Sequence, residues 1–217
     1  MPTLNQKSNI TLPIVMYTKV QLPYEYNALE PILSKTAVKE HYDFHYSNYT
    51  KGLNEAYLKN KTQLKLINIL HNINAYPKEF RENGGGYINH SIFFQCLKPL
   101  SSNGNPIPDS LKKLMVNDFG SVDEFMNYFI GMGKKVFGSG WVWWCIAPNG
   151  RTIIATTKNQ DTPYSENLYP IFGIDVWEHS YYLDYLGDRL KYLNEIFKIV
   201  NWDYVISRIK IKINSYV

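Results

Sequence analysis

The sequence predicts an α+β protein whose first half is helical and whose second half mixes helices with strands. Between positions 34 and 97, apolar residues recur at the three- and four-residue spacing of amphipathic helices. Two β-rich runs follow, residues 141–147 and 151–157, and they flank Pro148-Asn149-Gly150, a strong hairpin signal. Residues 101–108, rich in Pro, Gly and Asn, are the best candidate for a linker between the halves.

Three helices are expected in the first half. Ser34 is a suitable N-cap for a helix over residues 34–59, and a second helix is expected over residues 63–73. The third, over residues 87–97, stops before a proline. We expect the run Gly84-Gly85-Gly86 to break the chain ahead of it.

In the second half, helices are expected both before and after the strands in the sequence. Residues 169–177 are β-rich and are a candidate third strand. The helices expected from apolar periodicity cover residues 111–119, 122–137, 181–200 and 202–211.

Composition excludes several classes of protein. The chain has 217 residues with 15% aromatics, which excludes a disordered protein, and only 13 Gly and 11 Pro, which excludes a collagen-like one. No run reaches the roughly 20 apolar residues that a membrane-spanning helix needs. The net charge of +4 is too small and scattered to indicate a nucleic-acid partner. Two cysteines, Cys96 and Cys145, suit a reducing compartment. We expect a cytoplasmic protein, with the mitochondrial matrix as the alternative.

Candidate metal ligands occur where a strand pattern gives way to polar sequence. Asp175 and His179 are four residues apart, so a turn or a first helical turn would bring both side chains to one ion. Carboxylate and imidazole together suit Fe, Mn or Zn. The alternative is a surface pair or a pair at a dimer contact. The spacing alone leaves both interpretations open.

Further candidates lie in the helical half. His41, His45 and Tyr49 follow one another at four-residue steps and therefore share a helix face. A buried polar row of this kind needs hydrogen-bond partners or a metal, because desolvation is otherwise costly. The alternative is a satisfied polar seam under the core. His90 is either a ligand or an ordinary residue of a first helical turn, and His71 is expected at the surface.

The motifs that contain these residues resemble, in order, those of the iron/manganese superoxide dismutases. The most specific is Asp175-Val176-Trp177-Glu178-His179-Ser180-Tyr181-Tyr182. The resemblance extends from about residue 22 to residue 206. The other matching segments are residues 22–31, 41–49 with 53–54, 85–93, 137–143 and 200–202.

The resemblance implies an N-terminal α-helical hairpin domain followed by an α/β domain with a three-stranded antiparallel sheet. We expect residues 1–21 to form an N-terminal extension, residues 22–104 the α-hairpin domain and residues 105–217 the C-terminal α+β domain. Both domains would then contribute to one site.

The resemblance also implies the metal and its reaction. His41, His90, Asp175 and His179 would bind one ion, with a water or hydroxide as fifth ligand. The enzyme would be a superoxide dismutase, an oxidoreductase that converts superoxide to dioxygen and hydrogen peroxide by cycling one Mn or Fe ion between +3 and +2. The three imidazoles and the carboxylate suit a metal that changes charge in this way.

Residues around the metal follow from the same resemblance. Gln160 would hold the metal-bound solvent, and Tyr49 would hydrogen-bond Gln160 and form the substrate gate with His45. Three tryptophans would form the walls of the site: Trp141, Trp143 and Trp177.

The position of the glutamine favours manganese. Iron-type members carry the amide just before the Asn-His motif, and residues 86–89 here contain no Gln, whereas Gln160 has the manganese-type position. Iron, or use of either metal (a cambialistic enzyme), is the alternative.

The implied assembly is a homodimer, with a homotetramer as the alternative. Glu178 would reach His179 of a second subunit, and Tyr182 would reach His45 of that subunit. The expected partner is superoxide, without nucleic acid or membrane. Rival interpretations are a non-catalytic member that keeps the fold and a metal-assisted hydrolase. Two residues depart from the family pattern: Phe94 replaces a common Trp, and Tyr46 a common His.

Overall fold

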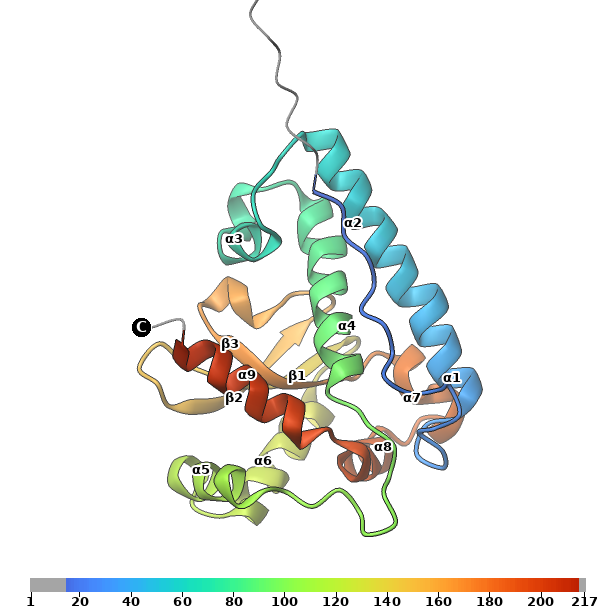
Figure 1. Cartoon of the computed structure of the whole chain (residues 1–217), viewed down its shortest axis with the longest axis vertical. Helices are drawn as coiled ribbons and strands as arrows, with labels where there is room; N and C mark the ends of the chain where they lie inside the picture. The colour runs from blue at the N-terminus through green and yellow to red at the C-terminus, as the bar shows by residue number, and fades with distance from the viewer. Residues whose placement is uncertain (1–14, 215–217) are drawn as a thin grey trace, which may run out of the picture.

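Two helical arms that lie side by side form the first half of the protein (Figure 1). The computed structural model describes residues 15–214. Ser34 caps the first arm, because its side chain accepts a hydrogen bond from the Ala37 N–H at 3.2 Å. The first arm consists of α1 (Lys35–Glu40), a π-helical segment (His41–Tyr46) and α2 (Ser47–Asn60). The helix α3 (Leu66–His71) and a short 3-10 turn (Ile73–Ala75) lead to the second arm, which consists of a π-helical segment (Phe80–Gly84) and α4 (Gly85–Gln95).

The glycine run does not break the chain, so that expectation is wrong. Gly84 closes the second π-helical segment, and Gly85 and Gly86 open α4 without interruption. The glycines instead permit close packing. A Cβ on Gly85 would overlap the backbone oxygen of Gln160, and one on Gly86 would overlap the ring of Tyr49. Glycine is required at these two positions because there is no room for a side chain, and not because the backbone needs an unusual conformation.

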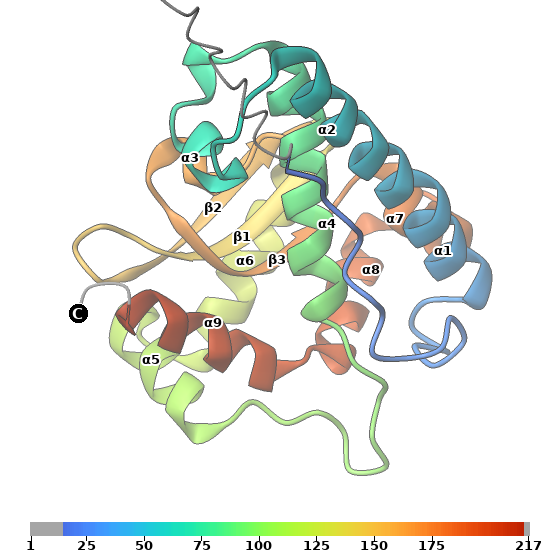
Figure 2. The same ribbon diagram turned by 45° about the horizontal axis from the view of Figure 1, so that its top comes forward.

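The second half is built around a sheet of three antiparallel strands in the order β2-β1-β3 (Figure 2). The strand predictions are confirmed: β1 (Gly140–Ile146), β2 (Thr152–Lys158) and β3 (Tyr169–Asp175). The central strand β1 is buried throughout. Helix α4 packs against β3, and α6 packs against β1 and β2. The helices are α5 (Asp109–Phe119), α6 (Val122–Lys135), α7 (Glu178–Tyr185), α8 (Arg189–Glu195) and α9 (Trp202–Asn214).

The single helix expected over residues 181–200 is wrong. Helix α7 ends at Tyr185, and Leu186 adopts a positive φ of 51°. Asp188 then starts α8 by accepting a hydrogen bond from the Lys191 N–H at 2.9 Å. The apolar pattern continues across this turn and therefore does not reveal it. The turn depends on the positive φ of Leu186, a residue that is itself apolar.

The segment ahead of the first arm runs along the hairpin. The Tyr17 N–H donates to Asn54 Oδ1 at 2.8 Å, and Asn54 Nδ2 donates back to the Tyr17 carbonyl at 2.9 Å. The expected extension, residues 1–21, lies partly outside the described residues, and its boundary at residue 22 stays a prediction. No helix within residues 15–214 is long and apolar enough to cross a membrane.

Candidate metal centre

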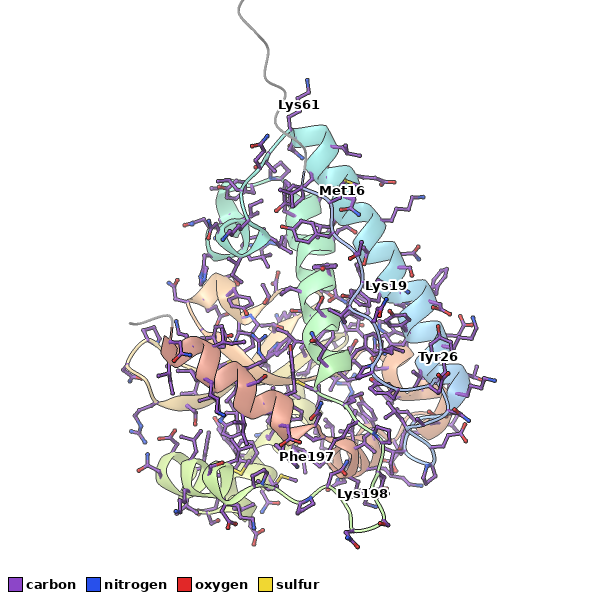
Figure 3. All side chains as sticks on the ribbon, in the orientation of Figure 1. Met16, Lys19, Tyr26, Lys61, Phe197 and Lys198 are labelled. Carbon is purple, nitrogen blue, oxygen red and sulfur yellow. The ribbon has the colours of Figure 1, made fainter. Side chains whose placement is uncertain are left out.

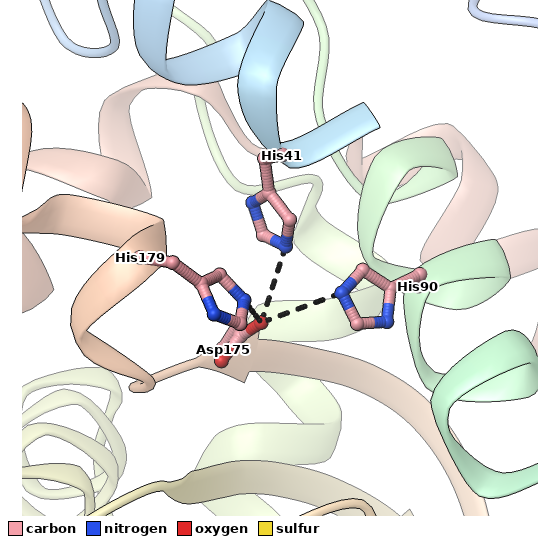
Figure 4. A group of neighbouring side chains, drawn as sticks. All are labelled: His41, His90, Asp175 and His179. Atoms are coloured by element: carbon pink, nitrogen blue, oxygen red, sulfur yellow. Dashed lines mark ion pairs between the residues drawn. The ribbon is translucent and has the colours of Figure 1, made fainter. Parts of the chain in front are cut away.

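Four side chains from distant parts of the chain point toward one another between the hairpin and the sheet (Figure 4). They are His41, His90, Asp175 and His179, and their ligand atoms all lie within 4.8 Å of one another. Asp175 Oδ2 is 3.2 Å from the Nε2 of His41, 3.3 Å from that of His179 and 3.8 Å from that of His90.

Each half of the chain supplies two of these side chains. His41 begins the first π-helical segment, and His90 lies inside α4. Asp175 is the last residue of β3, and His179 lies in the first turn of α7, so the sharp passage from strand to helix brings this pair together. The Trp177 N–H donates to Asp175 Oδ1 at 2.8 Å. This turn-like hydrogen bond occupies one carboxylate oxygen and leaves Oδ2 directed at the histidines.

The buried polar atoms of this cluster lack hydrogen-bond partners. The Nε2 atoms of the three histidines and Asp175 Oδ2 are all buried, and none makes a hydrogen bond within the described residues, because their mutual contacts lack the geometry. Unpaired buried polar atoms cost several kilocalories per mole, so four converging on one point indicate a missing partner. A single cation would satisfy all four. Three imidazoles and a carboxylate fit Mn, Fe or Zn.

The imidazoles are set up to present lone pairs. His90 Nδ1 lies 2.7 Å from the Gly86 carbonyl, which only accepts, so Nδ1 carries the proton and Nε2 offers its lone pair. Burial lowers the pKa of His41 and holds the pKa of His90 well below its ordinary value. Burial alone would raise the pKa of Asp175, but His179 and His41 hold it below its usual range. The cluster therefore combines the Asp175 carboxylate with neutral imidazoles at His41 and His90.

An amide is fixed beside the cluster. Asn159, with a φ of 50°, follows β2 and turns Gln160 inward, where it is 5% exposed. Gln160 Oε1 accepts from Trp141 Nε1 at 3.2 Å and from Asn89 Nδ2 at 3.4 Å. Gln160 Nε2 donates to the Tyr49 hydroxyl at 3.1 Å. Two donors on the oxygen thus determine which end of the amide faces Tyr49.

Aromatic rings enclose the cluster. Trp141 is fully buried, stands opposite Asp175 in the β1–β3 register and lies 5.3 Å from the His90 ring. Trp177 stacks on His179 at 5.4 Å and is partly exposed. The ring of His45, which was expected at the substrate gate, also stacks on His179, with centroids 3.9 Å apart. Burial, with His179 and His41 nearby, lowers the pKa of His45 to about 4. Indole and imidazole rings thus border the cluster on the sides of His90 and His179.

Two residues that support the site were not singled out from the sequence. Asn89 is fully buried and also donates to the backbone oxygens of Gln160 and Asp161, at 3.3 and 3.2 Å. The Tyr192 hydroxyl donates to the Asp175 carbonyl at 2.9 Å. The role of Asn89 could have been suspected because it precedes the candidate ligand His90, whereas no neighbouring residue in the sequence points to Tyr192.

A buried three-histidine, one-carboxylate cluster between a helical hairpin and an α+β domain defines a mononuclear metalloprotein. Residues 16–98 match the α-hairpin domain of the iron/manganese superoxide dismutases, and residues 107–208 match their C-terminal domain. The manganese superoxide dismutase of Chlamydia muridarum is 40% identical over 195 residues, 88% of this chain and 95% of that protein. That of Acinetobacter baylyi is 37% identical over 199 residues, 88% of this chain and 86% of that protein. The chain belongs to the iron/manganese superoxide dismutase family.

Gly85→Ala is expected to destabilise the protein by about 1–3 kcal/mol, because the new methyl group meets the backbone of Gln160, which cannot rotate away. Gly131, also helical but with open space around its Cα, is the matched control. Gly131→Ala is expected to stabilise the protein by about 0.5–1 kcal/mol. Urea unfolding of both variants measures the difference. Equal stability of the two would show that Gly85 is not a packing position.

Proposed function

We propose that the chain is a superoxide dismutase that converts superoxide to dioxygen and hydrogen peroxide. The observation that supports this best is the convergence of four buried, unpartnered ligand atoms on one point. His41, His90, Asp175 and His179 would hold the ion. When bound, the metal supplies one-electron chemistry, accepting an electron from one superoxide and passing it to another.

Manganese is the preferred metal, and iron, or the use of either metal, is the alternative that the family allows. The relatives described above are manganese enzymes, and the family includes both metals. Gln160, which enters from the end of β2, supports manganese because it occupies the position expected of manganese-type members.

The chain's own residues manage protons in the site. Burial raises the pKa of Tyr49, so the phenol keeps its proton at neutral pH. Because Gln160 Nε2 donates to the Tyr49 oxygen, the Tyr49 hydrogen is directed elsewhere and can be donated to a substrate or solvent oxygen. Formation of hydrogen peroxide consumes two protons, and Tyr49 is positioned to deliver one from solvent. Trp141 keeps other water away from the cluster.

The function is tested by superoxide consumption with one metal at a time. Metal-free protein is loaded with Mn, with Fe or with Zn, which has no redox chemistry, and decay of superoxide is followed by stopped flow. The Mn form is expected to consume superoxide faster than the same concentration of free Mn, and the Zn form is not. If neither the Mn nor the Fe form exceeds free metal, the proposed activity is wrong.

We also propose the domain division at residues 22 and 105 and a cytoplasmic location. The free, buried Cys96 and Cys145 support a reducing compartment. The loop between α4 and α5, which contains residue 105, supports the second boundary.

A homodimer is supported by exposed apolar and aromatic side chains on α7 and in the segment just ahead of β1. Phe137 is 97% exposed, Leu183 59% and Tyr182 51%. Glu178, also exposed, starts α7, and its carboxylate accepts from the Ser139 hydroxyl at 3.2 Å, two residues along the chain from Phe137. A twofold-related copy would cover these side chains and bring a second Glu178 to His179.

Leu183→Glu is expected to convert the dimer to a monomer, because it places a charge among side chains that the proposed dimer would bury. Leu58→Glu, on α2, is the control, since Leu58 is also exposed (48%) and lies on a different helix. Sedimentation velocity at micromolar concentration measures the mass. A wild-type monomer, or a Leu183→Glu dimer, would contradict the proposed interface.

A further inference from the structure

A row of three tyrosines connects the candidate metal centre to the protein surface. The ring of Tyr46 stacks on His90, with centroids 5.7 Å apart and planes 15° apart. Tyr42 lies 5.8 Å from Tyr46, and Tyr26 lies 6.3 Å from Tyr42. Tyr46 is fully buried, Tyr42 is half-buried, and the Tyr26 hydroxyl is at the surface, near the start of the first arm (Figure 3).

The spacing suits transfer of single electrons. Each step joins rings within the distance range of aromatic pairs in contact, so no step crosses a gap. Phenols are among the side chains that lose one electron most easily. Tyr46 is also where this sequence departs from the family pattern, and without a phenol at this position the row would not reach the candidate ligand His90.

Charges along the row give it a direction. Lys19 Nζ lies 3.7 Å from the centre of the Tyr42 ring, and a cation there disfavours loss of an electron from Tyr42. The Tyr26 hydroxyl donates to both oxygens of Asp43, at 3.0 and 3.1 Å. An oxidised phenol is a strong acid, so the Asp43 carboxylate can take its proton. An oxidised Tyr42 is therefore less stable than an oxidised Tyr26, and an electron vacancy that reaches Tyr42 moves on to Tyr26, where proton transfer to Asp43 traps it.

Two competing directions, one through Tyr87 and one through Trp141, lack such an end point. Tyr87 also contacts Tyr46, at 5.7 Å, but its hydroxyl donates to the Thr18 carbonyl, which cannot keep a proton. Trp141 contacts His90 and stacks on Trp143 at 5.2 Å, and both indoles are fully buried. Oxidation that moved to these tryptophans would damage the site rather than leave it.

We propose that Tyr46, Tyr42 and Tyr26 form an electron-transfer route that removes oxidising equivalents from the metal centre. The proposal rests on the proposed function for its oxidant. Superoxide and hydrogen peroxide together yield dioxygen, hydroxide and hydroxyl radical. The radical gains one electron from Tyr46 and becomes hydroxide. Tyr42 reduces Tyr46, Tyr26 reduces Tyr42, and the Tyr26 phenol gives its proton to Asp43. A soluble thiol then transfers a hydrogen atom to the Tyr26 phenoxyl radical and becomes a thiyl radical.

The experiment locates oxidised tyrosines after peroxide treatment of the metal-loaded protein. Protein loaded with ferrous iron is mixed with hydrogen peroxide, frozen rapidly for electron paramagnetic resonance, and digested for mass spectrometry. Tyr128 on α6 is the internal control, because it is 51% exposed and belongs to none of these ring contacts. An oxidant that acts from bulk solvent would modify Tyr128 at least as readily as Tyr26.

Wild-type protein is expected to show a tyrosyl radical and preferential modification of Tyr26 over Tyr128. Tyr42→Phe removes one oxygen atom and keeps the ring, and it is expected to reduce Tyr26 modification to the level of Tyr128 while oxidation of Trp141 rises. Tyr46→Phe is expected to do the same, and Tyr87→Phe to change nothing. Circular dichroism verifies folding of each variant.

Two results would overturn the route: equal modification of Tyr26 and Tyr128 in wild-type protein, or undiminished Tyr26 modification in folded Tyr42→Phe and Tyr46→Phe. Because peroxide is supplied directly, the labelling does not require dismutase turnover. Failure of the route therefore appears in the labelling, and failure of the proposed function appears in the superoxide assay.

Discussion

Asp175→Ala is expected to abolish manganese retention and, with it, superoxide consumption. Asp175 Oδ2 is the single carboxylate oxygen among the four ligand atoms that converge, and its removal leaves three imidazole nitrogens with no negative charge to balance that of the cation. Metal content after dialysis against a chelator measures the loss. Added manganese should raise the unfolding temperature of the wild type but not that of Asp175→Ala. A ligand present at about 1,000 times its Kd stabilises the folded protein by about 4 kcal/mol, and a variant that does not bind the ligand gains nothing.

Two variants separate ligation from general damage. Asp175→Asn keeps the size of the side chain but removes its charge, and we expect it to lose most of the metal too. Asp118→Ala removes a carboxylate that binds Thr152 at the start of β2, at 2.8 and 2.6 Å, and it should keep full metal content despite lower stability. Full manganese occupancy in folded Asp175→Ala would refute the ligand assignment.

Gln160→Leu is expected to lower the rate of superoxide consumption about 10–100-fold while metal content stays near that of the wild type. Leucine has a similar volume but no amide, so the indole N–H of Trp141 loses its acceptor and the Tyr49 oxygen loses its donor. The four candidate ligand atoms keep their positions. Rate and metal content, measured on the same sample, distinguish this result from that of Asp175→Ala.

A double-mutant cycle with Tyr49→Phe tests whether the two residues act together. If Gln160 acts through its hydrogen bond to Tyr49, the double variant should lose much less than the product of the two single losses. Fully multiplicative effects would show that Gln160 and Tyr49 contribute independently. An unchanged rate in Gln160→Leu would remove the amide from the mechanism altogether.

Local patterns predicted most of the elements but not their interruptions. The strands β1 and β2 are within one residue of their predicted bounds, because alternation and the Pro148-Asn149-Gly150 turn are signals confined to neighbouring residues. The same periodicity did not reveal the π-helical segment at His41–Tyr46 or the turn after Tyr185. Both depend on backbone conformations that packing selects, and an apolar pattern runs through them unchanged.

The candidate site divides in the same way. The types of its side chains, and the family, could be predicted from ordered motifs such as residues 175–182. The orientation of the Gln160 amide could not, because it depends on Asn89 from α4 and Trp141 from β1. The glycine run has the same dependence on distant residues, because Gly85 is required by the contact of α4 with Gln160 and Gly86 by its contact with Tyr49.

The sequence by itself determined the α+β class, the order of elements, the family and the residue types available to a metal. Periodicity, caps and motifs are properties of residues close together in the chain, so they can be identified without knowledge of the folded structure. Only the tertiary structure decided the distances at which His41 and His179, far apart in sequence, meet Asp175, and that Tyr26, Tyr42 and Tyr46 line up from the surface to His90. Those arrangements arise from packing between segments that are distant in the chain, which no local pattern encodes.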